Sequence, residues 1–322
     1  MTSFRDEAIF ALTNASVWLG RPGFALRCAF RLGRIPDFAR PRGHNELVQW
    51  RKHFDRNPLF GTFCDKLAAR TWARVRVPEL RTVEVLWVGT EAEAVPPEFL
   101  ADGYVIKSTC GSGRNYFPGR GRWTAAERAR RFRRWLQPSG GPGEWGYTLV
   151  RPRLFVERLL GRPEDLHELN LRCNDGAVTV GFCVNSWKTA GAAGAYLSAA
   201  GERIEAWADE ARWLSDDEIV PRELFERAAG YARRISAGID QLRVDFLIRE
   251  GELYLGELTV YSASGFGDEE RVGVGPVIER AWLGAIGRSW FLSAPQRGLR
   301  ARYAEAFRRW VPRRLAELAQ SP

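Results

Sequence analysis

The stretch LRVDFLIREGELYLGELTVY, residues 242–261, predicts two antiparallel strands joined by a turn centred on Gly251. Side chains of a strand point alternately to its two faces, and both halves of this stretch separate apolar from polar residues in that way. With that turn, Asp245 faces Glu257 and Arg243 faces Thr259 across the strand pair. The expected core face carries Leu242, Val244, Phe246 and Ile248, then Tyr254, Leu258 and Val260.

Two acidic side chains are thereby expected on one face of the hairpin. Directly opposed Cβ atoms lie about 5 Å apart, so the carboxylates of Asp245 and Glu257 repel each other. A divalent cation between them removes this repulsion, and Mg²⁺ takes such oxygen ligands when it also carries substrate phosphates. The alternative is a solvated polar face on which Arg243 neutralises Asp245, and this stretch alone leaves both interpretations open.

Length and composition bound the class of protein. A chain of 322 residues exceeds one small core, so two or three subdomains are expected. Hydrophobic residues make up 45% and charged residues 27% of the chain, as in ordinary globular proteins. No apolar run reaches about 18 residues, the length that predicts a transmembrane helix. The N-terminal stretch AIFALTNASVWLG is too short and too soon interrupted by Arg21 and Pro22 for a secretion signal, so a cytoplasmic location is expected.

The basic residues are mostly arginine. The formal net charge is +9, and only four of the 48 basic residues are lysines, namely Lys52, Lys66, Lys107 and Lys188. This balance fits an anionic substrate, a nucleotide or an acidic surface, although the arginines of residues 128–134 are more simply the solvated face of a helix. The sequence contains no nucleic-acid-binding motif, so no nucleic-acid partner is expected.

The cysteines predict neither disulfides nor a zinc site. They are odd in number and form no CxxC or Cys/His cluster. We expect them to be small buried apolar residues, with a reactive thiol as the alternative for the one beside a glycine-rich loop, Cys110. The five are Cys28, Cys64, Cys110, Cys173 and Cys183.

The order of predicted elements is that of an α+β protein. Helical patterns cover residues 1–60, with an interruption at 34–43, then residues 65–76, 123–136, 221–238 and 277–318. Strand patterns cover residues 82–88, 104–108 and 153–160, and residues 169–184 read as a hairpin that turns at 174–176. Antiparallel strands mixed with helices favour α+β over a doubly wound parallel sheet.

A glycine-rich loop follows one of these strands. The segment YVIKSTCGSGRN, residues 104–115, places Lys107 at the strand end and Gly111, Ser112 and Gly113 just after it. Glycines let backbone N–H groups approach phosphate oxygens closely, and the lysine supplies a positive charge. By itself the segment is also explained by a turn and a surface lysine, and it lacks the GK[ST] of a P-loop.

Taken in order along the chain, these features resemble the ATP-grasp superfamily and, within it, the TupA-like group associated with teichuronopeptide and cell-surface polymer biosynthesis. The resemblance runs from about residue 43 to residue 267. Its segments are HNELVQWRKHFDRNPLF with CDKLAAR, VIKSTCGSG, RPRLFVERLL, RVDF and GELTVYSASGFG. The last two are specific together, because related ligases hold their metal with an Arg-x-Asp strand paired with a Glu strand.

The resemblance implies an ATP-grasp fold, in which two α+β subdomains clasp ATP, with helical extensions at both ends of the chain. The expected parts are a helical N-terminal region (1–60), an N-terminal or linker subdomain (61–103), a small subdomain with the glycine loop (104–168), a large subdomain with the metal hairpin (169–268) and a helical C-terminal extension (269–322).

The resemblance also implies which residues bind ATP. The lysines and the glycine loop would contact the phosphates, a glutamate and a backbone position on the hinge strand would meet the adenine, and a second glutamate would bind the ribose. In that order these residues are Lys66, Lys107, Gly111, Ser112, Gly113, Glu157, Leu159 and Glu168.

Further residues are implied for the metal, the chemistry and the substrate. Mg²⁺ would be held by Asp245, Glu257 and Thr259. Arg243, with Lys107, would act in catalysis by stabilising negative charge on the transferring group. The candidate substrate contacts are Lys188, Arg114 and Ser264.

Two positions depart from the family pattern. Most ATP-grasp enzymes have Glu-x-Asn at the metal strand, whereas Thr259 stands here in place of the Asn, which predicts weaker binding of a second ion. TupA-like chains tend to carry Asp-x-Lys before the central hairpin, whereas this chain has Glu168 and Asn170. Lys188 is a candidate for the missing positive charge, with a plain loop lysine as the equal alternative.

The activity implied by the resemblance is an ATP- and Mg²⁺-dependent carboxylate–amine ligase that forms an amide bond through an acyl phosphate, acting on small-molecule or peptide substrates. The alternatives are a kinase acting on a hydroxyl group and a non-catalytic binding protein with the same fold. The sequence has no recognisable catalytic triad and no histidines in metal-like spacing, which agrees with catalysis by positioning and charge neutralisation.

The C-terminal stretch LRARYAEAFRRWVPRRLAEL lies outside the resemblance. It alternates arginine with large apolar residues, so we expect it to cap the core, with subunit pairing in a homodimer or contact with an anionic membrane as alternatives. Pro312 is expected to interrupt its helix.

Overall fold

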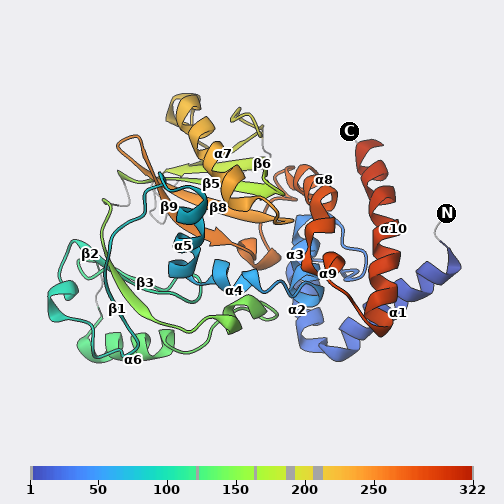
Figure 1. Cartoon of the computed structure of the whole chain (residues 1–322), viewed down its shortest axis with the longest axis horizontal. Helices are drawn as coiled ribbons and strands as arrows, with labels where there is room; N and C mark the ends of the chain where they lie inside the picture. The colour runs from blue at the N-terminus through green and yellow to red at the C-terminus, as the bar shows by residue number, and fades with distance from the viewer. Residues whose placement is uncertain (1–2, 121–122, 163–164, 186–192, 206–212, 321–322) are drawn as a thin grey trace.

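The computed structural model describes residues 3–120, 123–162, 165–185, 193–205 and 213–320 (Figure 1). In this part of the chain two antiparallel sheets, of four and five strands, are accompanied by helices. The expected α+β class is confirmed. Both chain ends and their helices lie at the right of Figure 1, and the sheets lie at the left.

The chain begins with a series of helices that covers the ranges predicted from the sequence. Ser3 begins the first helix by accepting a hydrogen bond from the N–H of Asp6, and Asp65 begins the fifth by accepting from the N–H groups of Leu67 and Ala68. The helices are α1 (Phe4–Gly20), α2 (Pro22–Leu32), α3 (Gly43–Phe54), α4 (Leu59–Cys64) and α5 (Lys66–Arg76).

The first sheet has the strand order β1-β4-β2-β3. A small separate core forms where α6 packs on it, with Phe132 and Trp135 of the helix against Ile106 and Val156 of the strands. The elements are β1 (Val85–Gly89), β2 (Tyr104–Ser108), β3 (Asn115–Tyr116), α6 (Ala125–Trp135) and β4 (Leu154–Arg158), with the 3₁₀ helices η1 (Pro97–Leu100) and η2 (Trp145–Leu149) between them.

The second sheet has the strand order β7-β6-β5-β8-β9. Its core face packs against α7, where Phe225 and Ile235 are buried. The expected hairpin turns at Asp175 and Gly176, and both have positive φ. The elements are β5 (His167–Asn174), β6 (Ala177–Asn185), β7 (Ala193–Leu197), η4 (Asp216–Glu218), α7 (Arg222–Ser236), β8 (Leu242–Arg249) and β9 (Glu252–Thr259).

The β8–β9 hairpin has the predicted pairing of its polar residues. Asp245 pairs with Glu257, and Arg243 pairs with Thr259. The apolar residues predicted for β8 are all buried, so its core face is also as expected.

A bulge that was not predicted makes this pairing possible. The tip is a two-residue turn at Glu250 and Gly251, both with positive φ, and from there the strands pair one residue out of the expected register. One extra residue in β9, Gly256, restores the predicted register before the polar pairs. The bulge also corrects one expectation, because Leu253 and Leu255 face the core on the tip side of it, and Tyr254 does not.

The C-terminal helices pack on the N-terminal ones, as Figure 1 shows for α1 and α10. Trp50 of α3 donates a hydrogen bond from Nε1 to the hydroxyl of Tyr303 at 2.8 Å and stacks on Phe307. The expectation that the last helix caps the core is therefore confirmed. The elements are η5 (Ser262–Gly265), α8 (Gly275–Ala285), η6 (Ile286–Arg288), α9 (Trp290–Ser293) and α10 (Gly298–Gln320).

The expectation that Pro312 interrupts the last helix is wrong, because α10 continues through it to Gln320. A proline removes a single intrahelical N–H donor. The turns just before it are held on the core by the buried side chains of Phe307, Trp310 and Val311. Among the described residues, no helix is both long and apolar enough to cross a bilayer.

A buried arginine joins the N-terminal helices to the second sheet. Arg51 of α3 pairs with Asp240 at 2.7 Å, and its guanidinium also donates to the backbone carbonyls of Gln241 and Val260. Asp240 in turn accepts from the indole N–H of Trp282 at 2.8 Å. A fully buried charge is tolerated only with such partners, so these contacts fix α3 against the start of β8 and the end of β9.

Candidate functional site

The polar residues of the β8–β9 hairpin form one compact cluster. Arg243 donates from Nε to Oδ1 of Asp245 at 2.7 Å and from Nη2 to Oδ2 at 2.6 Å. The hydroxyl of Thr259 donates to Glu257 Oε1 at 2.9 Å, and Nη2 of Arg243 lies 3.6 Å from the same oxygen. The facing acids and the neutralising arginine, which were alternative interpretations of the sequence, therefore occur together.

Both carboxylates of this cluster lie close to positive charge. Burial raises the pKa of the Asp245 carboxyl above its ordinary value. Its bonds to Arg243 oppose this shift, and the negative charge of Glu257 adds to it. Arg243 thus lies within reach of both carboxylates, and Lys66 contributes a further positive charge near Glu257.

A second arginine, which the sequence did not single out, extends the cluster along the neighbouring strand. Arg172 of β5 lies opposite Arg243 in the sheet and forms an ion pair with Glu269. Both arginines donate to the hydroxyl of Ser262, at 2.8 and 3.1 Å. His44 contacts Arg172, and its pKa lies well below the ordinary value because it is buried among positive charges. His44 is therefore neutral, and its ring packs against the ring of Trp282.

On the first sheet, Glu157 of β4 joins two basic residues. Lys107 of β2 lies 2.7 Å from one of its carboxylate oxygens, and Arg70 of α5 pairs with the other. Burial alone would raise the pKa of Glu157, but these two neighbours lower it below the ordinary value. The predicted adenine residue Glu157 and the predicted phosphate residue Lys107 are therefore directly bonded to each other in this structure.

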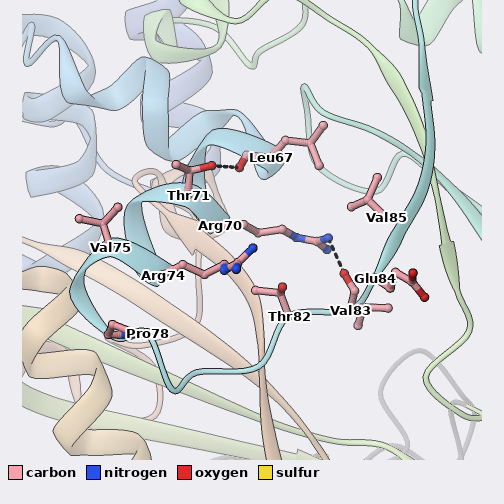
Figure 2. A pocket seen from close by; sticks show the side chains of 10 residues that line it. All are labelled: Leu67, Arg70, Thr71, Arg74, Val75, Pro78, Thr82, Val83, Glu84 and Val85. Atoms are coloured by element: carbon pink, nitrogen blue, oxygen red, sulfur yellow. Dashed lines mark hydrogen bonds between the residues drawn. The ribbon is translucent and has the colours of Figure 1, made fainter.

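Arg70 also borders an open depression of about 750 Å³ between α5 and residues 82–85 (Figure 2). Figure 2 shows its guanidinium reaching across to the carbonyl of Val83, to which Nη1 donates at 3.0 Å. Arg74 points into the same space. The other end of the Arg70 guanidinium binds Glu157, so this arginine links the depression to one of the predicted nucleotide residues.

The glycine loop is fastened to α5 by the second predicted phosphate lysine. Lys66 donates from Nζ to the carbonyl of Gly111 at 2.8 Å. Gly111 and Gly113 have φ of +95° and +69°, and a Cβ on Gly111 would lie 2.9 Å from the hydroxyl of Ser139. Glycine is therefore required at position 111 by both conformation and space. Ser112, at the loop tip, is exposed.

Lys66 connects the two halves of the candidate site. Burial lowers the pKa of its ammonium group, the charge of Glu257 on β9 opposes this shift, and the charge of Lys107 on β2 adds to it. Helix α5, which begins with Lys66, also packs against β9. The structure thus brings together both lysines, the glycine loop and the acidic hairpin, which are separated by up to about 190 residues in the sequence.

Ser264 lies in a second polar cluster that the sequence only partly indicated. Its hydroxyl donates to Glu144 and accepts from Nζ of Lys52 at 2.8 Å. Lys52 is fully buried, and burial lowers its pKa. Lys52 and Glu144 could not be recognised from the sequence, because they meet Ser264 only through chain segments more than 100 residues away from it.

The remaining predicted site residues have structural contacts or lie elsewhere. Arg114 donates to the backbone carbonyls of Trp135 at 2.9 Å and Gln137 at 3.3 Å, so it ties the glycine loop to the end of α6. The N–H of Leu159 donates to the carbonyl of Gly103 at 2.8 Å. Glu168 lies on β5, between Val184 and Leu247 of the flanking strands. Lys188 is outside the described residues.

The described residues include one candidate metal pair and five buried cysteines. Among the residues that the structure describes, no group of three or more His, Cys, Asp or Glu side chains is arranged to hold a metal ion. The Asp245–Glu257 pair offers two carboxylates, which suits Mg²⁺ that arrives with phosphate oxygens. Cys110 is buried and its pKa is raised by burial, as expected for a structural rather than a reactive thiol.

Comparison with solved structures gives distant likenesses. D-alanine–D-alanine ligase from Bacillus anthracis complexed with ATP is 13% identical, with a TM-score of 0.39 over 80% of this chain and 68% of that one. The ATP-grasp ligase PsnB complexed with its minimal precursor is 15% identical, with a TM-score of 0.38 over 76% and 69%. D-cycloserine synthetase DcsG is 15% identical, with a TM-score of 0.38 over 83% and 78%.

No protein-family model matches the chain, and no curated protein matches it. With TM-scores below 0.5, the family expectation rests on the residues of this chain and their contacts.

Proposed function

We propose that this chain is an ATP-grasp enzyme of the TupA-like kind, an ATP- and Mg²⁺-dependent carboxylate–amine ligase that serves cell-surface polymer or peptide natural-product biosynthesis. The observation that carries the proposal is the meeting of Lys66, Lys107 and the glycine loop with the acidic hairpin of the other sheet. These elements have opposite charges, as a site for Mg²⁺-bound triphosphate requires.

In this proposal each half of the site has its own task. Lys66 and Lys107 neutralise the phosphates, and the backbone of residues 111–113 covers them. Asp245 and Glu257 hold Mg²⁺, with the Thr259 hydroxyl as a weaker third donor. On binding, Mg²⁺ would supply a positive charge that offsets the repulsion between the two carboxylates and orients the γ-phosphate.

The reaction then needs no nucleophile from the protein. A substrate carboxylate oxygen attacks the γ-phosphorus, the bond to the ADP oxygen breaks, and an acyl phosphate forms. An amine nitrogen attacks the acyl carbon, inorganic phosphate leaves, and the nitrogen loses a proton to give the amide. In this proposal Arg243, which is paired with Asp245, stabilises negative charge on the transferring group.

A non-catalytic role is the second candidate, because both oxygens of Asp245 are already bonded to Arg243 and because Thr259 replaces the usual Asn. Such a protein would bind nucleotide poorly. A kinase that uses the same site would release ADP with a single hydroxyl acceptor, whereas the ligase requires both a carboxylate and an amine.

The test is ATP binding measured by calorimetry with and without Mg²⁺. We expect Mg²⁺-dependent binding by the wild type and a loss of at least tenfold in affinity, together with the Mg²⁺ dependence, in Glu257→Ala. The matched control is Glu252→Ala at the tip of the same hairpin, whose side chain pairs with the exposed Arg81 and which should bind as the wild type does. Absence of binding by the wild type would leave only the non-catalytic candidate.

A further inference from the structure

A second depression, of about 520 Å³, lies beside the glycine loop, between the N-terminal helices and the loop that leads from α6 to η2. Its positive residues are Arg21 at the start of α2, Arg56 after α3 and Arg114 of the glycine loop. The opposite wall is backbone-rich, formed by residues 138–143 with several glycines. Two of its lining residues, Ser139 and Arg114, lie against Gly111.

The arginines of this depression have no acidic partner among the described residues. Arg56 donates to the carbonyl of Lys52 at 2.7 Å and lies over the ring of Trp145, and Arg114 donates only to backbone carbonyls. Within the described part of the chain none of the three forms an ion pair, whereas the lining acid, Glu144, is bonded to Ser264 and Gly141.

We propose that this depression binds an anionic group of the substrate, a carboxylate or a phosphate. The proposal rests on the proposed ligase function, in which the substrate must lie next to the phosphates of ATP. Three guanidinium groups with free donors suit an oxyanion, and glycine N–H groups can approach it closely. An anionic group held here would place the rest of the substrate beside the glycine loop, and the specificity would be for acidic substrates.

The experiment is calorimetric titration with inorganic phosphate, with glutarate and with its neutral counterpart glutaramide, in the presence and absence of Mg²⁺ and ADP. We expect the wild type to bind at least one anion and not glutaramide, and the double variant Arg21→Gln/Arg56→Gln to lose at least tenfold in affinity. The control is Arg130→Gln, an exposed arginine of α6 outside the depression. Which anion binds distinguishes a carboxylate site from a phosphate site.

Failure to bind either anion, or equal binding by the double variant and the wild type, would overturn the proposal. The titrations without nucleotide test the anion site separately from the ligase function, because they measure anion binding whether or not ADP binds. Conversely, ADP binding without anion binding would leave the ligase function intact and remove this substrate site.

An independent observation concerns the outer surface of α1 and α2. Large apolar side chains are exposed there: Phe4 at 92%, Leu19 at 83% and Phe30 at 87% of their surface, with Leu12, Leu26 and Ile35 also largely exposed. At 100° per residue, the exposed residues at 4, 8, 11, 12, 15 and 19 fall within an arc of about 100° on α1, and all are apolar. We call the six large side chains the N-terminal apolar face.

The charges around this face are positive. Helix α2 contains Arg27 and Arg31 and no acidic residue, and Arg21 and Arg34 flank it. The acids of α1 are already bonded, Asp6 to Arg309 and Glu7 to Arg40. A second copy of the chain would bring arginines against arginines across a twofold axis. An anionic lipid surface matches both the apolar side chains and the positive charge.

From this we infer that the N-terminal apolar face docks on an anionic membrane surface without spanning it. The test is flotation with vesicles of phosphatidylglycerol and phosphatidylcholine, compared with phosphatidylcholine alone. We expect binding to the anionic vesicles only, reduced at least tenfold in Leu19→Ser/Phe30→Ser and reduced by Arg27→Gln. The control, Val75→Ser, removes an equally exposed apolar side chain on α5, at 73% exposure, and should bind as the wild type does.

Two outcomes would overturn this inference. One is the absence of vesicle binding by the wild type. The other is a concentration-dependent dimer of the wild type in analytical ultracentrifugation that is absent in Leu19→Ser/Phe30→Ser, together with no vesicle binding by either protein. That result would assign the face to a second copy of the chain.

Discussion

Ala263 and Ser264, in the loop after β9, both have left-handed backbone conformations, with φ of 45° and 56°. Such conformations cost about 1 kcal/mol or more for residues other than glycine. The hydroxyl of Ser264 is bonded to Lys52 and Glu144, which compensates for this cost. The methyl group of Ala263 is exposed and has no comparable contact.

We therefore predict that Ala263→Gly raises the free energy of unfolding by about 1 kcal/mol, because relief of the strain exceeds the added freedom of the unfolded chain. Urea unfolding measures the change. Ala15→Gly, at an exposed position in the middle of α1, should instead lower stability by about 0.5–1 kcal/mol. A loss of stability in Ala263→Gly would show that the alanine is not strained.

Only some residues of the candidate site could be predicted from the sequence. Lys107, Asp245 and Glu257 were recognisable because each stands next to a local signal, a glycine loop or a strand alternation, and Lys66 was predicted from the family resemblance. No such signal marks Arg172, Lys52 and Glu144, which complete the polar clusters. Their partners lie far away in the sequence, so only the folded chain identifies them.

At the scale of elements, the polar pairs of the β8–β9 hairpin were predicted correctly although its turn and its bulge were not. The polar pairs were assigned by counting from one turn residue. The actual turn has two central residues, and the bulge at Gly256 supplies the missing position. Alternation alone could not show the bulge, because Gly256 has no side chain to assign to either face.

Deletion of Gly256 should therefore give a regular hairpin with the same pairs, in which Glu257 still faces Asp245 and Leu258 stays in the core. We expect this variant to keep nucleotide binding and most of the thermal stability of the wild type. Gly256→Ala is the matched substitution: it keeps the extra residue, and its Cβ would lie 3.0 Å from the carbonyl oxygen of Asp245, so a larger loss of stability is expected. Thermal unfolding and nucleotide binding measure both variants. Loss of nucleotide binding in the deletion variant alone would contradict this register.

At the scale of the whole molecule, the helices from both ends of the chain form one unit with the second sheet. Asp55, at the end of α3, accepts a hydrogen bond from the N–H of Phe291 in α9 at 3.1 Å. Burial, together with the negative charge of Asp240, raises its pKa to about 7. The sequence predicted these helices but not their mutual packing, because it depends on contacts between residues more than 200 positions apart.

This pKa gives a pH dependence with a definite sign. In the unfolded chain the Asp55 carboxyl ionises near pH 4, and in the folded chain near pH 7, so the folded state binds the proton more tightly between these values. Stability should fall as the pH rises from about 4 to about 7, by up to about 1.4 kcal/mol per pH unit, and change little above that.

The measurement is the difference in free energy of unfolding between the wild type and Asp55→Asn from pH 5 to pH 8. The amide keeps the acceptor for the Phe291 N–H but does not ionise. We expect the free energy of unfolding of the wild type to fall relative to that of Asp55→Asn as the pH rises. Parallel curves for the two proteins would mean that Asp55 does not titrate in this range.

The buried arginine of α3 has a consequence for synthesis of the chain. Arg51 is fully buried against Asp240 and the backbone of Gln241, which lie 189 and 190 residues further along the chain. At about 5–20 residues per second, these partners leave the ribosome about 10 to 40 s after α3 does. Until then α3 carries an unpaired charge on the face that it must bury. Helix α3 is thus made well before it can dock on the second sheet, and its apolar surface is open to chaperones during that interval.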